Sequence, residues 1–438
     1  MPTDRHTDGP RTAEPSALTR RDLLTGAAGV LGGAVIAGLP SLAGGQQAAV
    51  AAAIAAPLAP PGRPVVPADA TIVPGTPTTP VGTRSPFETP ARTPYGENVG
   101  NSLTPLQKLS GTITPSDLHF ERHHAGIPAI DPERHRLVIH GLVERPVAFS
   151  LGDLKRFPQV TRTCFIECSG NGRAAFRDPK PDMTPQKVAG LMSNTEWTGV
   201  PLAALFREAG VKKEARWFLA EGGDACLLSR SVPMEKAWDD ALVVWGQNGE
   251  PLRPEQGYPL RLLLPGWEGN INVKWLRRLE VGTRPWATRW ETSKYTDPLP
   301  NGTARQYSFV LDSKSLITSP CAPATLSVKG WRSVSGLAWS GRGAIVMVEV
   351  SVDGGRSWHK AELTGPALTK ACVGFQYMWN WTGAAATLLS RATDETGYVQ
   401  PTRAELLKVR GPGTDYHFNQ IVGWSVGTDG AMTFQGES

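Results

Sequence analysis

Residues 163–173 read Thr-Cys-Phe-Ile-Glu-Cys-Ser-Gly-Asn-Gly-Arg, and they follow an apolar, β-favouring run that starts at Val160. The run from Val160 to Ile166 predicts a strand, and the small, glycine-rich residues after it predict a tight turn. A strand that ends in a tight turn holds one side chain rigidly at the rim of a sheet. Here that side chain is Cys168, so the chemistry of its thiol is the first question that the sequence raises.

The length and charge of the chain limit the classes of function. The chain has 438 residues, which suffices for two domains with additional segments. Its formal net charge is +5, and no dense block of Lys and Arg occurs. We therefore expect no nucleic-acid partner, although a local group of arginines for a small anion remains open.

The cysteine count argues against a disulfide scaffold. The chain contains five cysteines, Cys164, Cys168, Cys226, Cys321 and Cys372. So few cysteines in a long chain do not form a disulfide framework, and the odd number leaves at least one thiol free or bridged to another molecule.

The N-terminal segment predicts export. Arg20 and Arg21 precede an apolar, Ala/Gly-rich run from Gly26 to Leu39, and small residues near Ala43 suit cleavage by a signal peptidase. Paired arginines are typical of the twin-arginine route, which carries folded proteins. We expect a twin-arginine signal peptide over residues 1–45 and a periplasmic or extracytoplasmic location, with an uncleaved membrane anchor as the alternative.

Composition divides the rest of the chain into three parts. Residues 46–100 are rich in Pro and Ala, and we expect a disordered linker there. Residues 101–300 mix strands and short helices without a regular βαβ rhythm, which predicts an α+β domain. Its predicted elements are strands at 137–139, 217–220, 241–245 and 260–264 and helices at 150–154 and 202–209.

Residues 305–436 predict a β-sandwich of immunoglobulin-like pattern, a fold of about a hundred residues. The expected strands are short and separated by turns, at 324–328, 344–352, 358–363, 375–381 and 386–392. Asp353-Gly354-Gly355 between two of them indicates a hairpin, and the only helix expected here contains Ala404 to Leu406. The Cys…Trp…Cys core of antibody domains is absent from the sequence.

Local sequence leaves four interpretations of Cys168. It is a buried structural cysteine, half of a zinc pair with Cys164, a nucleophilic thiol activated by nearby Arg173, or a soft thiolate ligand to a redox metal. The zinc interpretation is weak, because no second Cys/His pair lies at ligand spacing.

Two further clusters carry candidate binding residues. Phe120-Glu121-Arg122-His123-His124 suggests metal or phosphate binding, but consecutive side chains on an extended chain point to opposite sides, so a solvated polar loop is the alternative. The segment from Gln256 to Trp275 predicts a strand that delivers a loop with Arg261 and Lys274 near its two ends. Basic side chains and backbone N–H groups at such turns bind phosphate, although surface Arg and Lys are common.

Taken together and in order, these clusters resemble the sulfite oxidase family of molybdopterin enzymes. The resemblance also includes Trp197 to Leu202, Asp224 and residues 247–252, and it extends from about residue 110 to the C-terminus. Residues 290–297 and 390–402 are similar to the molybdenum subunit of the SoxC-type sulfite/sulfane dehydrogenases. The fold that the resemblance implies is a molybdopterin-binding domain followed by an immunoglobulin-like dimerisation domain.

The resemblance also implies roles for individual residues. Cys168 matches the single protein ligand to molybdenum, and Arg122, Arg173 and Tyr295 match residues that face the substrate. The positions matched to cofactor binding are Phe120, Arg122, His123, His124, Asp224, Gln256, Arg261, Asn272 and Lys274.

The implied activity is oxidation of sulfite or of a sulfane sulfur on a carrier protein, with Mo-molybdopterin as the cofactor. The sequence contains no Cys-x-x-Cys-His motif, so a separate c-type cytochrome is the expected electron acceptor. A homodimer or a heterotetramer is the expected assembly.

Three positions depart from the family pattern. His123 replaces the usual Asn, Gln256 stands where a pterin-contacting His is common, and Gly172 stands where many sulfite oxidases carry another Arg. The missing side chain at Gly172 suggests a roomier site that accepts a sulfur chain attached to a carrier.

Four other functions compete with this interpretation. A methionine-sulfoxide reductase of the same fold is disfavoured by the paired arginines, and a nitrate reductase by the missing haem and flavin modules. A secreted thiol hydrolase would need a histidine partner for Cys168 that no spacing indicates. The last alternative is a binding module in which the cysteine is inert.

Overall fold

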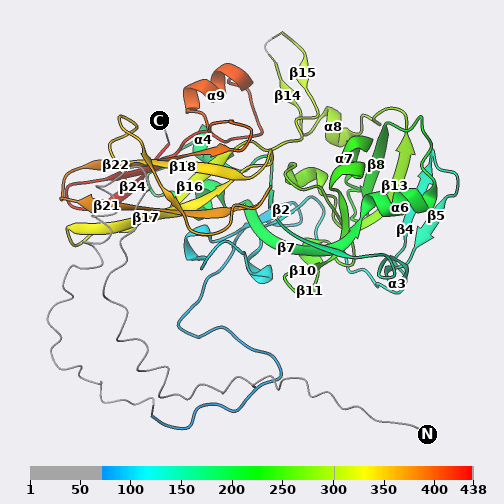
Figure 1. Cartoon of the computed structure of the whole chain (residues 1–438), viewed down its shortest axis with the longest axis horizontal. Coiled ribbons are helices and arrows are strands. Elements are labelled where there is room, and N and C mark those ends of the chain that lie inside the picture. Colours follow the sequence, from blue (N-terminus) through cyan, green and yellow to red (C-terminus); the bar gives the residue numbers. More distant parts are fainter. Residues whose placement is uncertain (1–71, 300, 437–438) are drawn as a thin grey trace, which may run out of the picture. The chain divides into compact units, whose positions relative to one another are not determined.

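The computed structural model describes residues 72–299 and 301–436 (Figure 1). The predicted signal peptide over residues 1–45 and the first part of the predicted linker lie outside the described residues. Within the described residues, the strand β1 (Thr93–Gly96) lies inside the segment expected to be linker. It pairs with β2 (Gly100–Leu103), which pairs with β3 (Glu121–His123), so this part of the expected linker belongs to a small sheet.

The sheet that carries Cys168 has the order β11-β10-β7-β6, with β12 paired to β10. Its strands are β6 (Val160–Glu167), β7 (Met192–Pro201), β10 (Leu242–Gln247), β11 (Glu250–Pro251) and β12 (Arg261–Leu263). The strand predicted over residues 160–166 is confirmed as β6, which pairs with β7 as far as Glu167 opposite Met192. Only the C-terminal half of β6 is buried, and Cys168 follows it directly.

A second five-stranded sheet with the order β5-β4-β13-β8-β9 completes the first domain. Its strands are β4 (Leu137–Gly141), β5 (Val147–Phe149), β8 (Trp217–Gly222), β9 (Ser229–Pro233) and β13 (Leu276–Gly282). The strands expected at 137–139, 217–220, 241–245 and 260–264 are thus present, with small shifts of their ends.

Short helices cover this domain. They are α3 (Leu151–Leu154), α4 (Arg173–Arg177), α5 (Pro185–Ala189), α6 (Leu202–Ala209), α7 (Met234–Asp239) and α8 (Arg289–Thr292). Ser150 begins α3 with a capping box to Asp153, and Gly210 ends α6 at φ +68°. The helices predicted at 150–154 and 202–209 are therefore confirmed.

The second domain consists of two facing sheets, with the orders β16-β17-β21-β20 and β19-β18-β22-β23-β24. The first contains β16 (Lys314–Ser319), β17 (Gly330–Trp339), β20 (Glu362–Leu363) and β21 (Val373–Trp381). The second contains β18 (Ile345–Ser351), β19 (His359–Lys360), β22 (Ala386–Asp394), β23 (Gly423–Val426) and β24 (Met432–Gln435). A hairpin of β14 (Asp297–Pro298) and β15 (Ala304–Arg305) precedes this sandwich.

The sandwich prediction is confirmed in outline and differs at two of the expected strands. The segment 358–363 forms two short strands, β19 and β20, which belong to different sheets. Residues 353–355 connect β18 to β19 as an antiparallel hairpin, with Gly354 and Gly355 at positive φ. The helix expected around Ala404–Leu406 is α9 (Arg403–Arg410). No strand forms at 324–328, where Thr325 makes only an isolated bridge to Ala431, and the sheet uses β16 and β17 instead.

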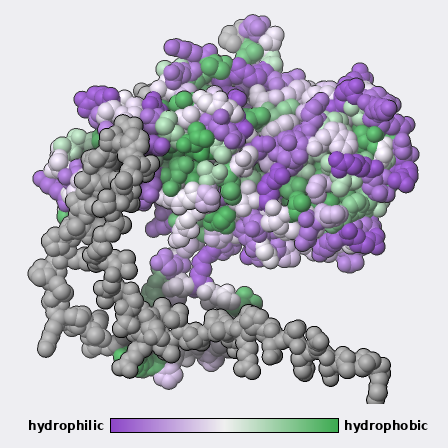
Figure 2. Space-filling view, in the orientation of Figure 1, coloured by the Kyte–Doolittle hydropathy of each residue, from purple (hydrophilic) through white to green (hydrophobic). Residues whose placement is uncertain are grey.

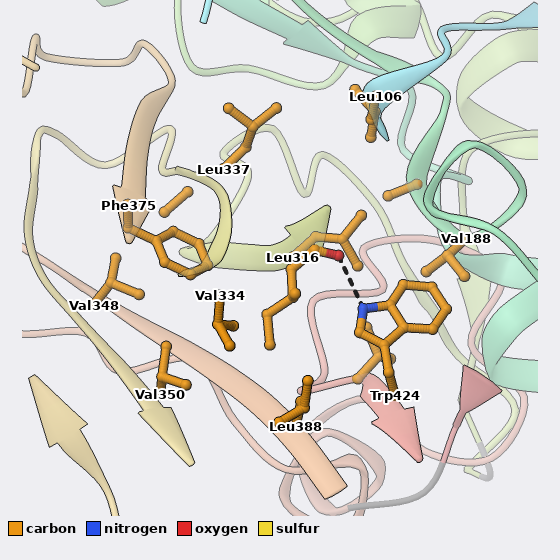
Figure 3. Close-up of a cluster of buried hydrophobic side chains, with 14 of the residues drawn as sticks. Leu106, Val188, Leu316, Val334, Leu337, Val348, Val350, Phe375, Leu388 and Trp424 are labelled. Carbon is orange, nitrogen blue, oxygen red and sulfur yellow. Dashed lines mark hydrogen bonds between the residues drawn. The ribbon is translucent and has the colours of Figure 1, made fainter. Parts of the chain in front are cut away.

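The main hydrophobic core is shared by both domains (Figure 3). Leu316, Val334 and Trp424 of the sandwich pack in one cluster with Leu106 and Val188 of the first domain. The indole N–H of Trp424 donates a 3.0 Å hydrogen bond to the carbonyl of Ile317, so this buried polar atom is satisfied. The domains therefore meet through packed apolar side chains.

No helix among residues 72–299 and 301–436 is long and apolar enough to cross a membrane. Figure 2 shows hydrophilic side chains over most of the visible face, with smaller apolar patches between them. The large apolar side chains lie mainly in the interior clusters.

Candidate active site

The pocket beside Cys168 is built from five separate stretches of the first domain. It is formed by the end of β6, the β3 strand with the residues around it, the loop between β8 and β9, the segment from Gln256 to Lys274, and the loop after α8. The lining residues are His119, Phe120, Arg122, His124, Ile166, Cys168, Leu228, Gln256, Arg261, Gly269, Asn270, Asn272, Lys274 and Tyr295. The three clusters singled out in the sequence thus meet in one place.

The backbone of Cys168 is fixed by two hydrogen bonds, one made by its N–H and one by its carbonyl. Its N–H donates to the carbonyl of Leu191 at 2.9 Å, and its carbonyl accepts from the N–H of Asn171 at 2.8 Å. Burial raises the pKa of the thiol above its ordinary value, and the Gly170 backbone N–H and the charge of Arg122 only partly oppose this effect. A nucleophile needs a lowered thiol pKa, so the environment of Cys168 does not favour the hydrolase interpretation.

The zinc interpretation also finds no support in the geometry. Across the described parts of the chain, no group of three or more His, Cys, Asp or Glu side chains is placed to hold a metal ion. Cys164 is fully buried inside the sheet, and burial raises its thiol pKa to about 12. A metal bound at Cys168 would therefore take its remaining ligands from a cofactor and not from protein side chains.

Tyr295, His124 and Arg122 form a hydrogen-bonded row along one wall of the pocket. The Tyr295 hydroxyl lies 2.8 Å from Nε2 of His124, and Nδ1 of His124 lies 3.3 Å from Nη2 of Arg122. Burial, with the charge of Arg122, lowers the pKa of His124 to about 3, so its ring is neutral at pH 7. Because guanidinium only donates, Nδ1 accepts, Nε2 carries the proton, and the Tyr295 oxygen accepts from it.

This arrangement leaves the Tyr295 hydroxyl proton available to a bound molecule. Tyr295 has φ +53°, and its backbone N–H donates to the Tyr416 hydroxyl at 3.0 Å. The Arg230 guanidinium lies 5.1 Å from the centre of its ring. Burial raises the pKa of Tyr295, which keeps the hydroxyl protonated and able to donate.

Two cations, the buried Arg261 and the half-buried Lys274, mark the opposite end of the pocket. The Arg261 guanidinium donates to the carbonyls of Gln256 at 3.1 Å and Asn272 at 3.2 Å, and Lys274 Nζ donates to the carbonyl of Glu255 at 2.8 Å. Burial lowers the pKa of Arg261 to about 9 and that of Lys274 to about 7. Neither cation has a carboxylate within ion-pair distance in the described structure, so their charges are suited to a buried anion.

The pocket also contains buried polar atoms that the described residues leave without a hydrogen-bond partner. These atoms are Nε2 of His119, Nε of Arg261 and Oδ1 of Asn270. His119 Nδ1 lies 2.9 Å from the Phe120 carbonyl, so Nδ1 carries the proton and Nε2 is an acceptor. The pocket thus offers one unused donor (Arg261 Nε), two unused acceptors (His119 Nε2 and Asn270 Oδ1) and two cations. These groups fit molybdopterin, which is a heterocycle that carries a phosphate.

Three predicted site residues do not line the pocket. His123 turns away from it, with Nδ1 3.2 Å from the Asn98 carbonyl and Nε2 3.3 Å from the Glu121 carboxylate. Asp224 accepts from the Cys226 thiol at 2.8 Å and from the Leu228 N–H at 3.1 Å, so it shapes the loop that places Leu228 in the wall. Arg173 donates to the Asp415 carbonyl at 2.6 Å and lies over the Tyr416 ring.

Five lining residues were missed by the sequence reasoning: His119, Ile166, Leu228, Gly269 and Asn270. Gly269 lies in η5 (Gly269–Ile271), and a Cβ there would approach the Glu167 carbonyl to 2.9 Å. Asn270 donates to the Ser169 hydroxyl at 3.0 Å. The sequence indicates these residues only through their neighbours. His119 directly precedes Phe120, and Gly269 and Asn270 lie just before Asn272, two positions that were predicted to bind the cofactor.

Gly172, where a roomier site was expected, does not line the pocket. Gly172 has φ +96°, which favours glycine, and a Cβ there would lie 3.1 Å from Phe418 Cβ and 3.4 Å from Lys314 Nζ. The second domain therefore fills the space next to Gly172. The smaller residue allows a close contact between domains instead of enlarging the pocket.

Comparison with known proteins agrees with this geometry. The family model for the oxidoreductase molybdopterin binding domain matches residues 124–290, and that for the Mo-co oxidoreductase dimerisation domain matches residues 305–423. The crystal structure of the sulfane dehydrogenase SoxCD from Paracoccus pantotrophus is similar, with a TM-score of 0.80 and 44% identity over 84% of this chain and 96% of that chain.

Several curated proteins are also similar. Mouse (Mus musculus) mitochondrial sulfite oxidase is 30% identical over 356 residues, or 74% of this chain and 64% of that protein. Chicken (Gallus gallus) sulfite oxidase is 30% identical over 326 residues, or 69% of this chain and 71% of that protein. Nitrate reductase [NADH] of Solanum lycopersicum is 30% identical over 352 residues, or 70% of this chain.

The chain spans 38% of the tomato nitrate reductase and 64% of the mouse sulfite oxidase. Both of its domains are matched, and the pocket suits the cofactor that these matches imply, which is Mo-molybdopterin. The chain belongs to the sulfite oxidase family of molybdopterin oxidoreductases.

Proposed function

We propose that this protein is a sulfite or sulfane dehydrogenase that oxidises an anionic sulfur compound and passes the electrons to a c-type cytochrome. The observation that supports this proposal best is the 44% identity to the sulfane dehydrogenase SoxCD over 96% of that chain. The pocket adds a chemical reason, since an uncompensated arginine and a proton-donating tyrosine lie beside the thiol of Cys168.

In this proposal Cys168 holds the molybdenum through its thiolate. Its place at the end of a paired strand fixes the direction of the sulfur atom, and a bound metal would keep it deprotonated despite the raised pKa. When bound, Mo-molybdopterin supplies the two-electron redox centre and the site of oxygen transfer to sulfur.

Arg122 and Tyr295 bind the substrate anion. Arg122 Nη1 donates to the Gly100 carbonyl at 3.1 Å, and no carboxylate in the described structure lies within ion-pair distance of its guanidinium. The charge of Arg122 is therefore available to an anion. Tyr295 adds a neutral donor that His124 orients, and fixed donors of this kind stabilise charge that develops during the reaction.

Arg261 and Lys274 hold the phosphate end of the cofactor. Arg261 is buried and Lys274 half-buried, and the cost of removing their charges from water falls when a dianion enters. Gln256 helps to position this end of the pocket. Its side-chain amide donates to the Phe120 backbone carbonyl at 2.9 Å, and its backbone carbonyl accepts from Arg261 at 3.1 Å.

Oxidation of sulfite to sulfate takes one oxygen atom from water and releases two protons and two electrons. A c-type cytochrome accepts one electron at a time, so each turnover needs two acceptor events. The name of the dimerisation domain and the similarity to SoxCD support a homodimer or a heterotetramer with such a cytochrome. Arg20 and Arg21 support export by the twin-arginine route to the periplasm.

The substrate is decided by a direct comparison of two sulfur donors. Purified protein with its cofactor is mixed with oxidised cytochrome c, and reduction is followed with free sulfite or with thiosulfate coupled to a sulfur carrier protein. We expect cytochrome reduction with the carrier-bound donor to exceed that with sulfite. Fast turnover of sulfite alone would reject the carrier, and no turnover of either donor would reject the proposed function.

A further inference from the structure

The carboxylate that precedes Cys168 is bound by the second domain. Glu167 ends β6 and is 4% exposed. Its Oε1 accepts from Lys314 Nζ at 2.9 Å, and its Oε2 accepts from the indole N–H of Trp339 at 2.7 Å. Lys314 begins β16 and Trp339 ends β17, so both donors come from the sandwich.

The residues after Cys168 are bound by the same domain. The Ser169 carbonyl accepts from the backbone N–H of His417 at 2.7 Å, and the Asn171 carbonyl accepts from Lys314 Nζ at 3.4 Å. Asn171 closes the loop, since its amide donates to Glu167 Oε1 at 2.8 Å. The backbone on both sides of the thiol is thus fixed by contacts that cross the domain boundary.

These contacts satisfy Glu167 completely for its buried position. Its two oxygens receive three donors, one of them charged. In a low-dielectric interior each of these hydrogen bonds is stronger than in water, and removing one partner leaves a buried charge without compensation. A change at Lys314 is therefore transmitted to the backbone that carries Cys168.

We propose that Lys314 and Trp339 are positioning residues that act through Glu167 to fix the direction of the Cys168 thiolate toward the cofactor. This inference rests on the proposed role of Cys168 as the metal ligand. The second domain then contributes to the geometry of the active site in addition to its role in assembly. Groups that orient a metal ligand from the second layer typically change metal affinity or activity by about 10- to 100-fold when they are removed.

A second ion pair between the domains provides a matched control. Lys370 of the sandwich donates to the Asp240 carboxylate of the first domain at 2.7 Å, and Asp240 is also buried. Neither side chain lines the pocket or contacts residues 167–172. Lys370→Met removes an interdomain ion pair while leaving the Cys168 loop with all its partners.

The first test uses the cofactor-free full chain and hydrogen–deuterium exchange. We expect the amides of residues 168–172 to exchange at least about tenfold faster in Lys314→Met than in the wild type, because opening of this loop becomes easier. Lys370→Met should leave these amides unchanged. Equal exchange in Lys314→Met and wild type would overturn the proposal, and equal acceleration in both variants would reduce it to general loosening of the domains.

The second test uses the holoenzyme and the electron paramagnetic resonance spectrum of the one-electron-reduced cofactor. We expect an altered spectrum and a kcat lower by about 10- to 100-fold in Lys314→Met, with Lys370→Met like the wild type. The double change Glu167→Gln with Lys314→Gln keeps a hydrogen-bonded pair without charge. Its spectrum should return toward that of the wild type, and it keeps the test decisive if the single variant does not fold.

The two tests separate this proposal from the proposed function. Exchange and the spectrum report the loop and the metal site whatever the substrate is. A protein that oxidises neither sulfite nor carrier-bound sulfur, but shows both changes, would retain the positioning role and lose only the proposed reaction. A wild-type spectrum and kcat in Lys314→Met would overturn the positioning role alone.

Discussion

The hydroxyl of Tyr295 lies 2.8 Å from Nε2 of His124, although 171 residues separate the two in the sequence. His124 is neutral and donates to the phenol oxygen, so the phenol proton is available for donation to a bound molecule. The pair explains why a tyrosine with a raised pKa lies beside the thiol of Cys168: it is a hydrogen-bond donor at neutral pH, not a base.

Replacing Tyr295 with Phe removes that donor and little volume. We expect kcat/KM for the sulfur substrate to fall by about 10²-fold, the size found for loss of one aligned donor, with molybdenum content unchanged. Tyr307→Phe is the control, since Tyr307 also has positive φ and does not line the pocket. Steady-state kinetics on both variants decides the matter, and equal rates would assign Tyr295 a packing role.

The Cys168→Ser change tests the metal ligand. A serine hydroxyl ionises far less readily than a thiol and donates less charge to a metal, so we expect turnover to fall by more than about 100-fold while the fold remains. Metal analysis measures the molybdenum content, circular dichroism measures the fold, and cytochrome reduction measures turnover. Cys321→Ser, a half-buried thiol in the sandwich, should behave like the wild type. Full activity of Cys168→Ser would refute the ligand role.

His119 makes the stability of the cofactor-free chain depend on pH. Burial lowers its pKa to about 3 in the folded protein, against an ordinary value of 6.5. The unfolded chain therefore binds the proton more tightly, and the stabilising contribution present above pH 6.5 is lost as the pH falls toward 3. A single group shifted in this way costs about 2 kcal/mol between pH 7 and pH 5.

Urea unfolding at pH 7 and pH 5 measures this effect. The loss of unfolding free energy on acidification should be smaller in His119→Gln by that amount, while exposed His359→Gln should match the wild type. An identical loss in His119→Gln and wild type would show that His119 is not held neutral.

Gly172→Ala tests the contact between the glycine-rich turn and the second domain. The added Cβ meets a backbone at φ +96° and lies 3.1 Å from Phe418 Cβ, so we expect a loss of unfolding free energy of about 1–3 kcal/mol. Gly397→Ala shares the positive φ of +83° but has no atom within 4 Å of the added Cβ. Its smaller loss, measured in urea, isolates backbone strain from the contact; equal losses would show that the contact costs nothing.

The sequence predicted those parts of the molecule that depend on neighbouring residues. The apolar run from Val160 to Ile166 forms its strand, and Gly354-Gly355 forms its hairpin, because both patterns act over a few residues. The strand expected at 324–328 does not form, since β propensity there competes with pairing that only the whole sandwich decides.

The sequence predicted most of the side chains that line the pocket, but it did not predict the contacts that hold those side chains from the second domain. Arg122, Cys168 and Lys274 carry distinctive chemistry, and the pocket brings them together. Lys314 lies 147 residues from Glu167, and no local pattern pairs a sandwich lysine with the strand before Cys168. His123, the last residue of β3, contacts Asn98 and Glu121, whereas His124 after the strand contacts Tyr295, as expected for consecutive side chains that point to opposite sides.

The apolar cluster that joins Leu316 and Trp424 to Leu106 and Val188 determines the smallest piece of this chain that can fold (Figure 3). A fragment ending near residue 300 would leave the first-domain members of that cluster facing water, among them Phe165 of β6, the strand that precedes Cys168. Calorimetry of the whole chain should accordingly show one transition, with neither half melting first. We expect removal of either domain to destabilise the other, because each contributes side chains to the shared cluster.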